Sequence, residues 1–134
     1  MPLLETDLIF AYLNTQDKHH QTAIELFNQI KQGKQVNISS LTLIELELLY
    51  KTNKIEHQLT PHITALTTLP NTTYISPTPE TILTAITLRQ EHSLTFFDSH
   101  HAATALQTDH QIISTDQAYS HIPTLTHIDL TDNK

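Results

Sequence analysis

The chain has 134 residues and a mass of 15.2 kDa, and 38% of its residues are hydrophobic, which predicts one domain with a single sizeable core. Acidic residues outnumber basic residues 14 to 7, which argues against a protein that binds nucleic acid through a basic face alone. The absence of cysteine excludes a disulfide framework and a thiolate zinc site, and the single glycine excludes a glycine-rich phosphate loop.

The N-terminal segment MPLLETDLIFAYLN carries two acids and no basic residue, so it is unlike a signal peptide. No stretch approaches the roughly 20 apolar residues that cross a bilayer. We therefore expect a cytoplasmic protein without a membrane partner. A single domain is predicted over residues 1–130, followed by a short tail over residues 131–134.

The first half of the chain predicts short strands that alternate with longer helices. A strand at residues 3–4 leads into a first helical turn. A helix capped by Asp17 is predicted over residues 19–33, since its apolar residues have helical spacing and a glycine stands at its end. A strand at residues 36–39 and a helix at residues 41–51 follow.

The second half continues this alternation. Helices are predicted over residues 57–69 and 79–91, with a strand at residues 73–76 between them. An alanine-rich helix is expected to begin at Asp98. The last strands are expected at residues 111–114 and 126–130. Such alternation indicates βαβ units and an α/β fold whose parallel sheet is covered on both faces, with the working site at the carboxyl ends of the strands.

Acidic residues fall near the predicted ends of these elements. They are Glu5 and Asp7 after the first strand, Glu45 in the helix after the second strand, Asp98 at the alanine-rich helix, and Asp116 after the segment IIST. Carboxylates that converge on one cleft repel one another, and a divalent cation relieves that repulsion. The set therefore predicts a Mg²⁺ or Mn²⁺ site.

Each of these acids also has a structural interpretation. Aspartate is a favoured helix N-cap, and Asp7, Asp98 and Asp116 each stand close to the start of a plausible helix or turn. Thr42 and Glu45 fit the capping-box pattern T-x-x-E, in which Glu45 would only stabilise a helix start. The prediction of a metal site rests on the whole set of acids and not on any single member.

The ten histidines suggest a competing zinc site. The pairs His19–His20 and His100–His101 are adjacent, and neighbours in a helix face different directions, so neither pair chelates one metal well. The zinc motif H-E-x-x-H is absent. Zinc is therefore less favoured than Mg²⁺ or Mn²⁺, and His101 is expected to pack beside the helix start near Asp98.

Four segments carry a resemblance to a known family: ETDLIFAYLN, ISSLTLIELELLYK, FFDSHHAATAL and IISTDQAY. In this order they resemble the PIN domain family, in particular the single-domain prokaryotic proteins that include the VapC toxins. The resemblance implies a three-layer α/β/α sandwich with a central, mainly parallel sheet. It also implies an acidic cluster that binds one or two Mg²⁺ or Mn²⁺ ions and supports cleavage of RNA phosphodiester bonds.

The resemblance assigns roles to individual positions. Glu45, Asp98 and Asp116 match the family's second, third and fourth acids, and Thr115 matches the hydroxyl residue that often precedes the last acid. These residues would form the catalytic, metal-binding site.

The first acidic position departs from the family pattern. The usual opening is D-T-N or D-T-S, which places Glu5 at the usual aspartate and Asp7 two positions later. Either residue, or both, could be the ligand. We expect Asp7 to be the essential first ligand, with Glu5 nearly as important.

Two functions of different classes follow. The first is a metal-dependent endoribonuclease of the VapC toxin type, which the resemblance associates with an RNA substrate, a homodimer and a small antitoxin. The alternative is a catalytically weak or inactive PIN-like scaffold that binds RNA or protein, an interpretation suggested by the glutamate at the first acidic position and by the acidic composition. The scarce basic residues Lys51, Lys54 and Arg89 are candidates for guiding an RNA strand.

Overall fold

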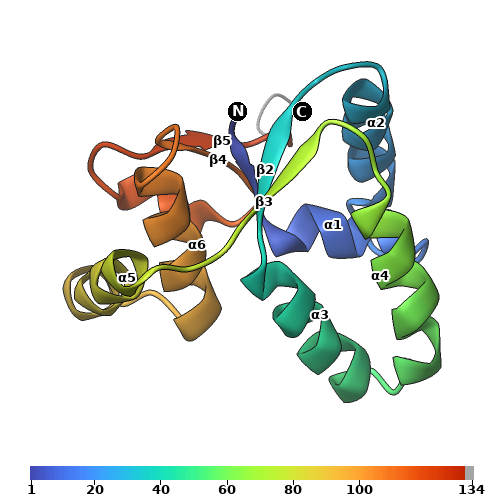
Figure 1. Cartoon of the computed structure of the whole chain (residues 1–134), viewed down its shortest axis with the longest axis horizontal. Helices are drawn as coiled ribbons and strands as arrows, with labels where there is room; N and C mark the ends of the chain where they lie inside the picture. Colours follow the sequence, from blue (N-terminus) through green and yellow to red (C-terminus); the bar gives the residue numbers. More distant parts are fainter. Residues whose placement is uncertain (132–134) are drawn as a thin grey trace.

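The computed structural model describes residues 1–131, which form a five-stranded sheet flanked by helices (Figure 1). All neighbouring strands are parallel, and their order is β3-β2-β1-β4-β5. The strands are β1 (Leu3–Leu4), β2 (Val36–Ser39), β3 (Thr72–Ile75), β4 (Gln111–Ile113) and β5 (Thr126–Ile128). Successive strands run outward from β1 to β3, and the chain then returns to place β4 beside β1. The order therefore reverses between β1 and β4, which is where open α/β sheets bind ligands.

Helices cover both faces of this sheet. They are α1 (Thr6–Leu13), α2 (His20–Lys31), α3 (Leu41–Thr52), α4 (Leu59–Thr67), α5 (Pro79–His92) and α6 (Phe96–Leu106), with short 3₁₀ helices η1 (Glu56–Gln58) and η2 (Gln117–His121). No helix in this described part of the chain is both long and apolar enough to span a membrane.

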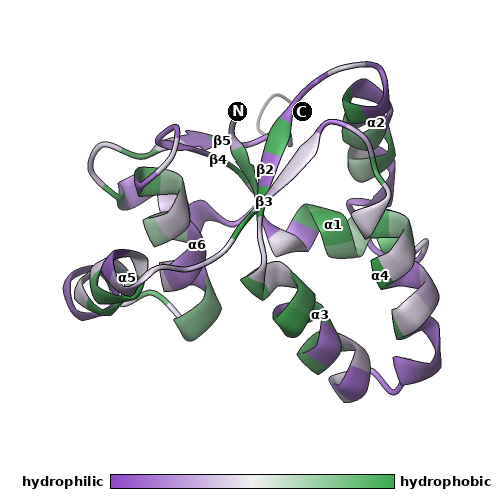
Figure 2. Ribbon diagram, in the orientation of Figure 1, coloured by the Kyte–Doolittle hydropathy of each residue, from purple (hydrophilic) through white to green (hydrophobic). Residues whose placement is uncertain are grey.

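Two hydrophobic clusters, one on each face of the sheet, confirm the predicted α/β/α layers. Leu4 and Ile113 belong to the cluster with α1 to α4, whereas Leu3 and Ile112 belong to the cluster with α5 and α6. Neighbouring strand residues separate in this way because successive side chains point to opposite faces. Figure 2 shows hydrophobic residues in β1 and β2, and hydrophilic residues in the loops that join α2 to β2 and α3 to α4.

Several element boundaries differ from the predicted ones. Asp17 does not cap α2, because its side chain accepts a hydrogen bond from the backbone N–H of His19 in the preceding turn. Helix α6 begins at Phe96, and its cap is Thr95, whose side chain accepts from the backbone N–H of Asp98. Asp98 therefore lies in the first turn of α6 and not at its start. The expected tail over residues 131–134 lies, beyond Thr131, outside the described residues.

The alternative interpretation of Glu45 as part of a capping box is also wrong. Helix α3 begins at Leu41, with Ser40 at the cap position, so Glu45 lies beyond the first helical turn. Thr42 is buried, and its hydroxyl lies 3.0 Å from the Thr6 hydroxyl of α1. Since Glu45 has no capping role, its carboxylate is available for other contacts.

Candidate metal centre

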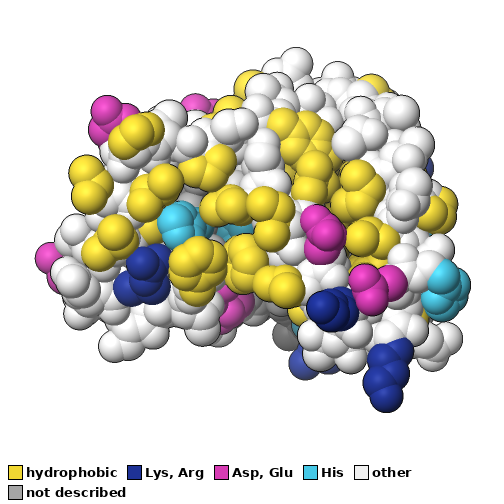
Figure 3. Space-filling view, turned by 60° about the horizontal axis from the view of Figure 1, so that its bottom comes forward, with side chains coloured by type: hydrophobic (Ala, Val, Ile, Leu, Met, Phe, Trp, Pro, Cys, Tyr) yellow, Lys and Arg dark blue, Asp and Glu magenta, His cyan; other side chains and the backbone are white. Residues whose placement is uncertain are grey.

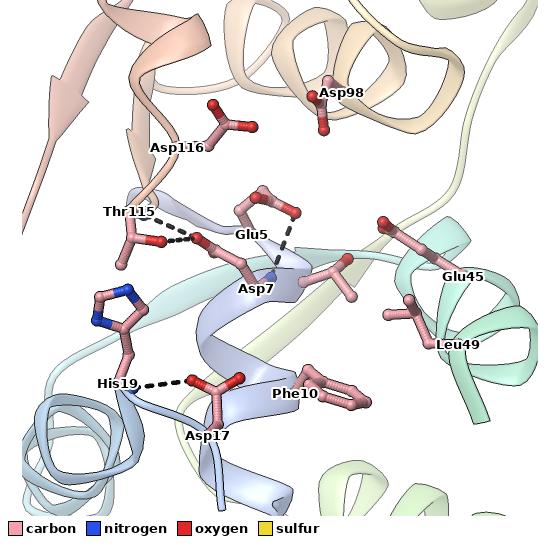
Figure 4. A pocket seen from close by; sticks show the side chains of 11 residues that line it. Glu5, Asp7, Phe10, Asp17, His19, Glu45, Leu49, Asp98, Thr115 and Asp116 are labelled. Atoms are coloured by element: carbon pink, nitrogen blue, oxygen red, sulfur yellow. Dashed lines mark hydrogen bonds between the residues drawn. The ribbon is translucent and has the colours of Figure 1, made fainter. Parts of the chain in front are cut away.

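The carboxyl ends of β1 and β4 open onto a cavity of about 400 Å³ that collects acids from four parts of the chain (Figure 4). Glu5 links β1 to α1, Glu45 projects from α3, Asp98 projects from α6, and Asp116 follows β4. Asp7 and Thr115 line the same cavity. The fold thus brings together all the residues that the sequence singled out for a metal site.

Glu5 is the most deeply buried of these acids, with 3% of the residue exposed. It is the N-cap of α1: its Oε1 accepts a hydrogen bond from the Asp7 backbone N–H at 3.3 Å, and its Oε2 accepts one from the Ser114 hydroxyl at 3.1 Å. Burial first, and then the charges of Asp7, Glu45 and Asp98, raise the pKa of Glu5 well above its ordinary value. An ionised Glu5 is therefore unfavourable unless a cation offsets its charge.

Asp7 is held by the chain segment that follows β4. Its Oδ2 accepts hydrogen bonds from the Thr115 backbone N–H at 2.8 Å, the Thr115 hydroxyl at 2.5 Å and the Ser114 hydroxyl at 3.2 Å. Its Oδ1 accepts from the Leu8 backbone N–H at 2.8 Å. Both oxygens of Asp7 thus have donors, and the side chain joins the start of α1 to the end of β4.

Glu45 is paired with a histidine from α6. The Nε2 of His101 lies 2.8 Å from the Glu45 Oε1 and 3.8 Å from the Glu5 Oε1. Ligand atoms of Glu5, Glu45 and His101 all lie within 4.8 Å of one another. His101 lies in α6 one turn after Asp98, and its hydrogen bonds join it to Glu45 and to Thr6, because the ring points from α6 toward α1 and α3.

Asp98 and Asp116 complete the acidic wall. The Oδ1 of Asp98 accepts a hydrogen bond from the Tyr119 hydroxyl at 3.2 Å, and burial, with a smaller contribution from the Asp116 charge, raises the Asp98 pKa. Asp116 is the N-cap of η2, and its Oδ1 accepts from the Ala118 backbone N–H at 2.9 Å. Capping and lining the cavity are therefore compatible roles for Asp116.

The family model for the PIN domain matches residues 3–125 of this chain. The chain belongs to the PIN domain family. Its resemblance to that family, drawn from four short segments, is confirmed across nearly the whole sequence. Among curated proteins, none matches this PIN domain.

Solved structures with the same fold cover nearly all of this PIN domain. VapC20 of Mycobacterium tuberculosis, a sarcin-ricin loop cleaving toxin, is 17% identical with a TM-score of 0.75 over 93% of this chain and 98% of its own. VapBC2 of Rickettsia felis, bound to a DNA fragment from its promoter, is 17% identical with a TM-score of 0.72, covering 95% and 96%. A toxin-antitoxin complex from Klebsiella pneumoniae is 22% identical with a TM-score of 0.66, covering 94% and 96%. At these identities the likeness shows the fold.

The PIN domain site contains residues that the sequence did not single out. Ser114 bridges Glu5 and Asp7, and Tyr119 contacts Asp98. For Ser114, the only local signal in the sequence was its position immediately before Thr115. The basic residues proposed to guide RNA, Lys51, Lys54 and Arg89, are not among those that line this cavity.

Proposed function

We propose that this PIN domain is a metal-dependent endoribonuclease of the VapC toxin type. The observation that carries the proposal is the convergence of Glu5, Glu45, Asp98 and Asp116 from separate elements on one cavity. Like charges are costly to gather around a buried carboxylate such as Glu5, so such a cluster is typical of a site that binds a cation. The similarity in fold to a toxin that cleaves the sarcin-ricin loop supports RNA as the substrate.

The donor set fits Mg²⁺ or Mn²⁺, which prefer carboxylate oxygens. Glu5 and Glu45, whose ligand atoms lie within 4.8 Å of each other, would hold the ion, and Asp98 and Asp116 would complete the site. Glu5 is a better candidate than Asp7 for the first ligand, because Asp7 accepts three hydrogen bonds of 2.5 to 2.8 Å from the chain, whereas each Glu5 oxygen accepts one longer bond, of 3.3 or 3.1 Å. Asp7 and Thr115 then fix the segment that carries Asp116.

When bound, the divalent ion would lower the pKa of a water molecule and polarise the scissile phosphate. The chain's own residues would bind the ion and orient the groups around it. Tyr119 donates a hydrogen bond to Asp98 and so holds its carboxylate in one position. The uncompensated carboxylates repel an RNA phosphate, so the cavity accepts the RNA backbone only when their charge is offset.

Metal-dependent cleavage is the direct test. The purified protein is expected to cleave total RNA in the presence of Mn²⁺ or Mg²⁺, to lose this activity in excess EDTA, and to regain it when the ion is restored. Single-stranded DNA of matched length is the control for substrate class. Cleavage that persists after chelation would contradict the proposal, and RNA binding without cleavage in any metal would favour the scaffold alternative.

The proposal includes an antitoxin partner and a location in the cytoplasm, where the RNA substrate is found. The antitoxin partner is supported by the similarity in fold to toxin-antitoxin complexes. Co-expression with a small protein encoded beside this chain would identify such a partner. Formation of the complex is expected to suppress the RNA cleavage described above.

The proposal also includes a homodimer, for which the exposed hydrophobic side chains of α3, α5 and α6 are candidates (Figure 3). Ile82, Ile86 and Phe96 line a groove on this face, and they are 43%, 37% and 57% exposed. Ile44 and Leu48, on the same side of α3 as the groove residue Leu41, extend the surface. An apolar patch of this kind marks an interaction site more often than a free surface.

Ile86→Glu is therefore expected to convert the dimer to a monomer, because it buries a charge in an apolar interface. Light scattering after size-exclusion chromatography should give twice the 15.2 kDa chain mass for the wild type and the single mass for the variant. Thr87→Glu, at an exposed position of α5 that does not line the groove, is the matched control and should remain dimeric. A wild type that is monomeric at every concentration would rule out the homodimer.

A further inference from the structure

His101 is a buried imidazole that contacts α3, α1 and the N-cap residue of α1 at the acidic cavity. Its side chain is fully buried on α6. Its Nε2 lies 2.8 Å from the Glu45 Oε1 of α3, 3.2 Å from the Thr6 hydroxyl of α1, and 3.8 Å from the Glu5 Oε1. One ring nitrogen thus connects two of the proposed metal ligands.

The second ring nitrogen, Nδ1, decides whether this histidine binds a metal itself or positions a carboxylate that does. The Nδ1 of His101 is buried and has no hydrogen-bond partner among residues 1–131. A histidine that binds a metal through one nitrogen normally donates its other N–H to an acceptor. Were Nε2 a ligand, the proton would sit on Nδ1, and a buried N–H without an acceptor is unfavourable.

The tautomer with the proton on Nε2 leaves no buried N–H of this ring without an acceptor. With the proton on Nε2, the ring donates to the Glu45 carboxylate, and Nδ1 presents only a lone pair to its buried pocket. The hydrogen bond is also needed locally. The Glu45 side chain is 18% exposed on a helix, and His101 is the described residue to which its carboxylate is hydrogen-bonded.

We infer that His101 is a positioning residue: its Nε2–H holds the Glu45 carboxylate beside Glu5, and the ring itself does not bind the metal. This inference rests on the proposed metal-dependent function of the site. It adds to the acids a residue from α6 that sets their geometry, three positions after Asp98 in the same helix.

The tautomer is measurable in the metal-free protein, independently of any metal. A long-range ¹H–¹⁵N spectrum is expected to show the His101 proton on Nε2, with the signal assigned by its loss in His101→Gln. A neutral ring with the proton on Nδ1 would overturn the inference. This result stands whether or not the protein binds Mn²⁺, so it separates a failure of the inference from a failure of the proposed function.

Mn²⁺ titrations test the role itself. His101→Leu removes the donor and is expected to weaken Mn²⁺ binding by about 10- to 100-fold, as loss of an outer hydrogen bond to a ligand does. His101→Gln keeps an N–H near the position of Nε2 and should stay within about threefold of the wild type. Pulsed electron paramagnetic resonance of bound Mn²⁺ should show no directly coordinated nitrogen.

His100 is the matched control, because it is the neighbouring buried histidine on α6 and its Nδ1 also lacks a partner in this part of the chain. Its ring packs against Phe96, with centroids 4.8 Å apart, and faces away from the cavity. His100→Leu should leave Mn²⁺ affinity unchanged. Nitrogen coupling from a directly bound imidazole, or an equal loss in His101→Gln and His101→Leu, would overturn the positioning role. Failure of the wild type to bind Mn²⁺ would instead contradict the proposed function.

Discussion

Glu5→Gln is expected to raise the melting temperature of the metal-free protein while weakening Mn²⁺ binding by about tenfold or more. The Glu5 carboxylate is buried and its pKa is raised, first by burial and then by the charges of Asp7, Glu45 and Asp98. Glutamine removes the charge but keeps an oxygen that accepts from the Asp7 N–H. Relief of this repulsion is expected to raise the melting temperature by about a few degrees.

The pH dependence of this difference has a definite sign. Because the pKa of Glu5 is higher in the folded chain than in the unfolded chain, its protonated form favours folding. That contribution is fully present below the unfolded pKa and is lost as the pH rises through the folded pKa. The stability gap between Glu5→Gln and the wild type should therefore widen above the ordinary value of 4.5. Thermal melts in EDTA at acidic and at neutral pH measure it.

Asp7→Asn is the matched control for Glu5→Gln. Asparagine keeps an acceptor for the Thr115 N–H and hydroxyl, which now bind the Asp7 Oδ2, and it recreates the opening in which asparagine follows two positions after the first acid. Mn²⁺ affinity should stay within about threefold of the wild type. Loss of binding in Asp7→Asn with retention in Glu5→Gln would make Asp7 the ligand, as the sequence first suggested.

Much of the fold was predictable because strands and helices leave local signals. Short apolar segments such as Ile112–Ile113 alternate with longer helical patterns, and this alternation predicts a parallel sheet between helical layers. The predicted start of α6 at Asp98 is two residues late, because Thr95 caps the helix and the first turn therefore begins at Phe96. The strand order could not be predicted, since it depends on tertiary packing.

The residues of the site likewise divide into those that leave a local signal in the sequence and those that do not. Glu5 and Asp116 were found because acids at the carboxyl ends of parallel strands meet at one edge of a sheet, and Asp98 because it stands near the start of the alanine-rich helix. The roles of Ser114 and His101 depend on contacts between residues far apart in sequence, 109 positions for Ser114 with Glu5 and 56 for His101 with Glu45. The capping-box error at Glu45 arose from a local pattern that the actual start of α3 overrides.

Asp98→Asn is expected to reduce RNA cleavage by about 100-fold or more with the fold intact, as loss of one charged group from a catalytic centre does. Asparagine keeps the oxygen that accepts from the Tyr119 hydroxyl. Burial, together with the nearby Asp116 charge, raises the Asp98 pKa, so removal of the charge should leave the melting temperature unchanged or slightly higher. Cleavage assays and thermal melts of the same preparation measure both effects.

Glu80→Gln is the matched control for Asp98→Asn, because it removes one carboxylate charge from an exposed position on α5 that does not line the cavity. It should cleave RNA at the wild-type rate. If the Asp98→Asn variant also cleaves RNA at the wild-type rate, Asp98 has no role in the reaction. Loss of cleavage together with loss of Mn²⁺ binding, against unchanged behaviour in Glu80→Gln, would instead tie the activity to the charge that Asp98 brings to the cavity.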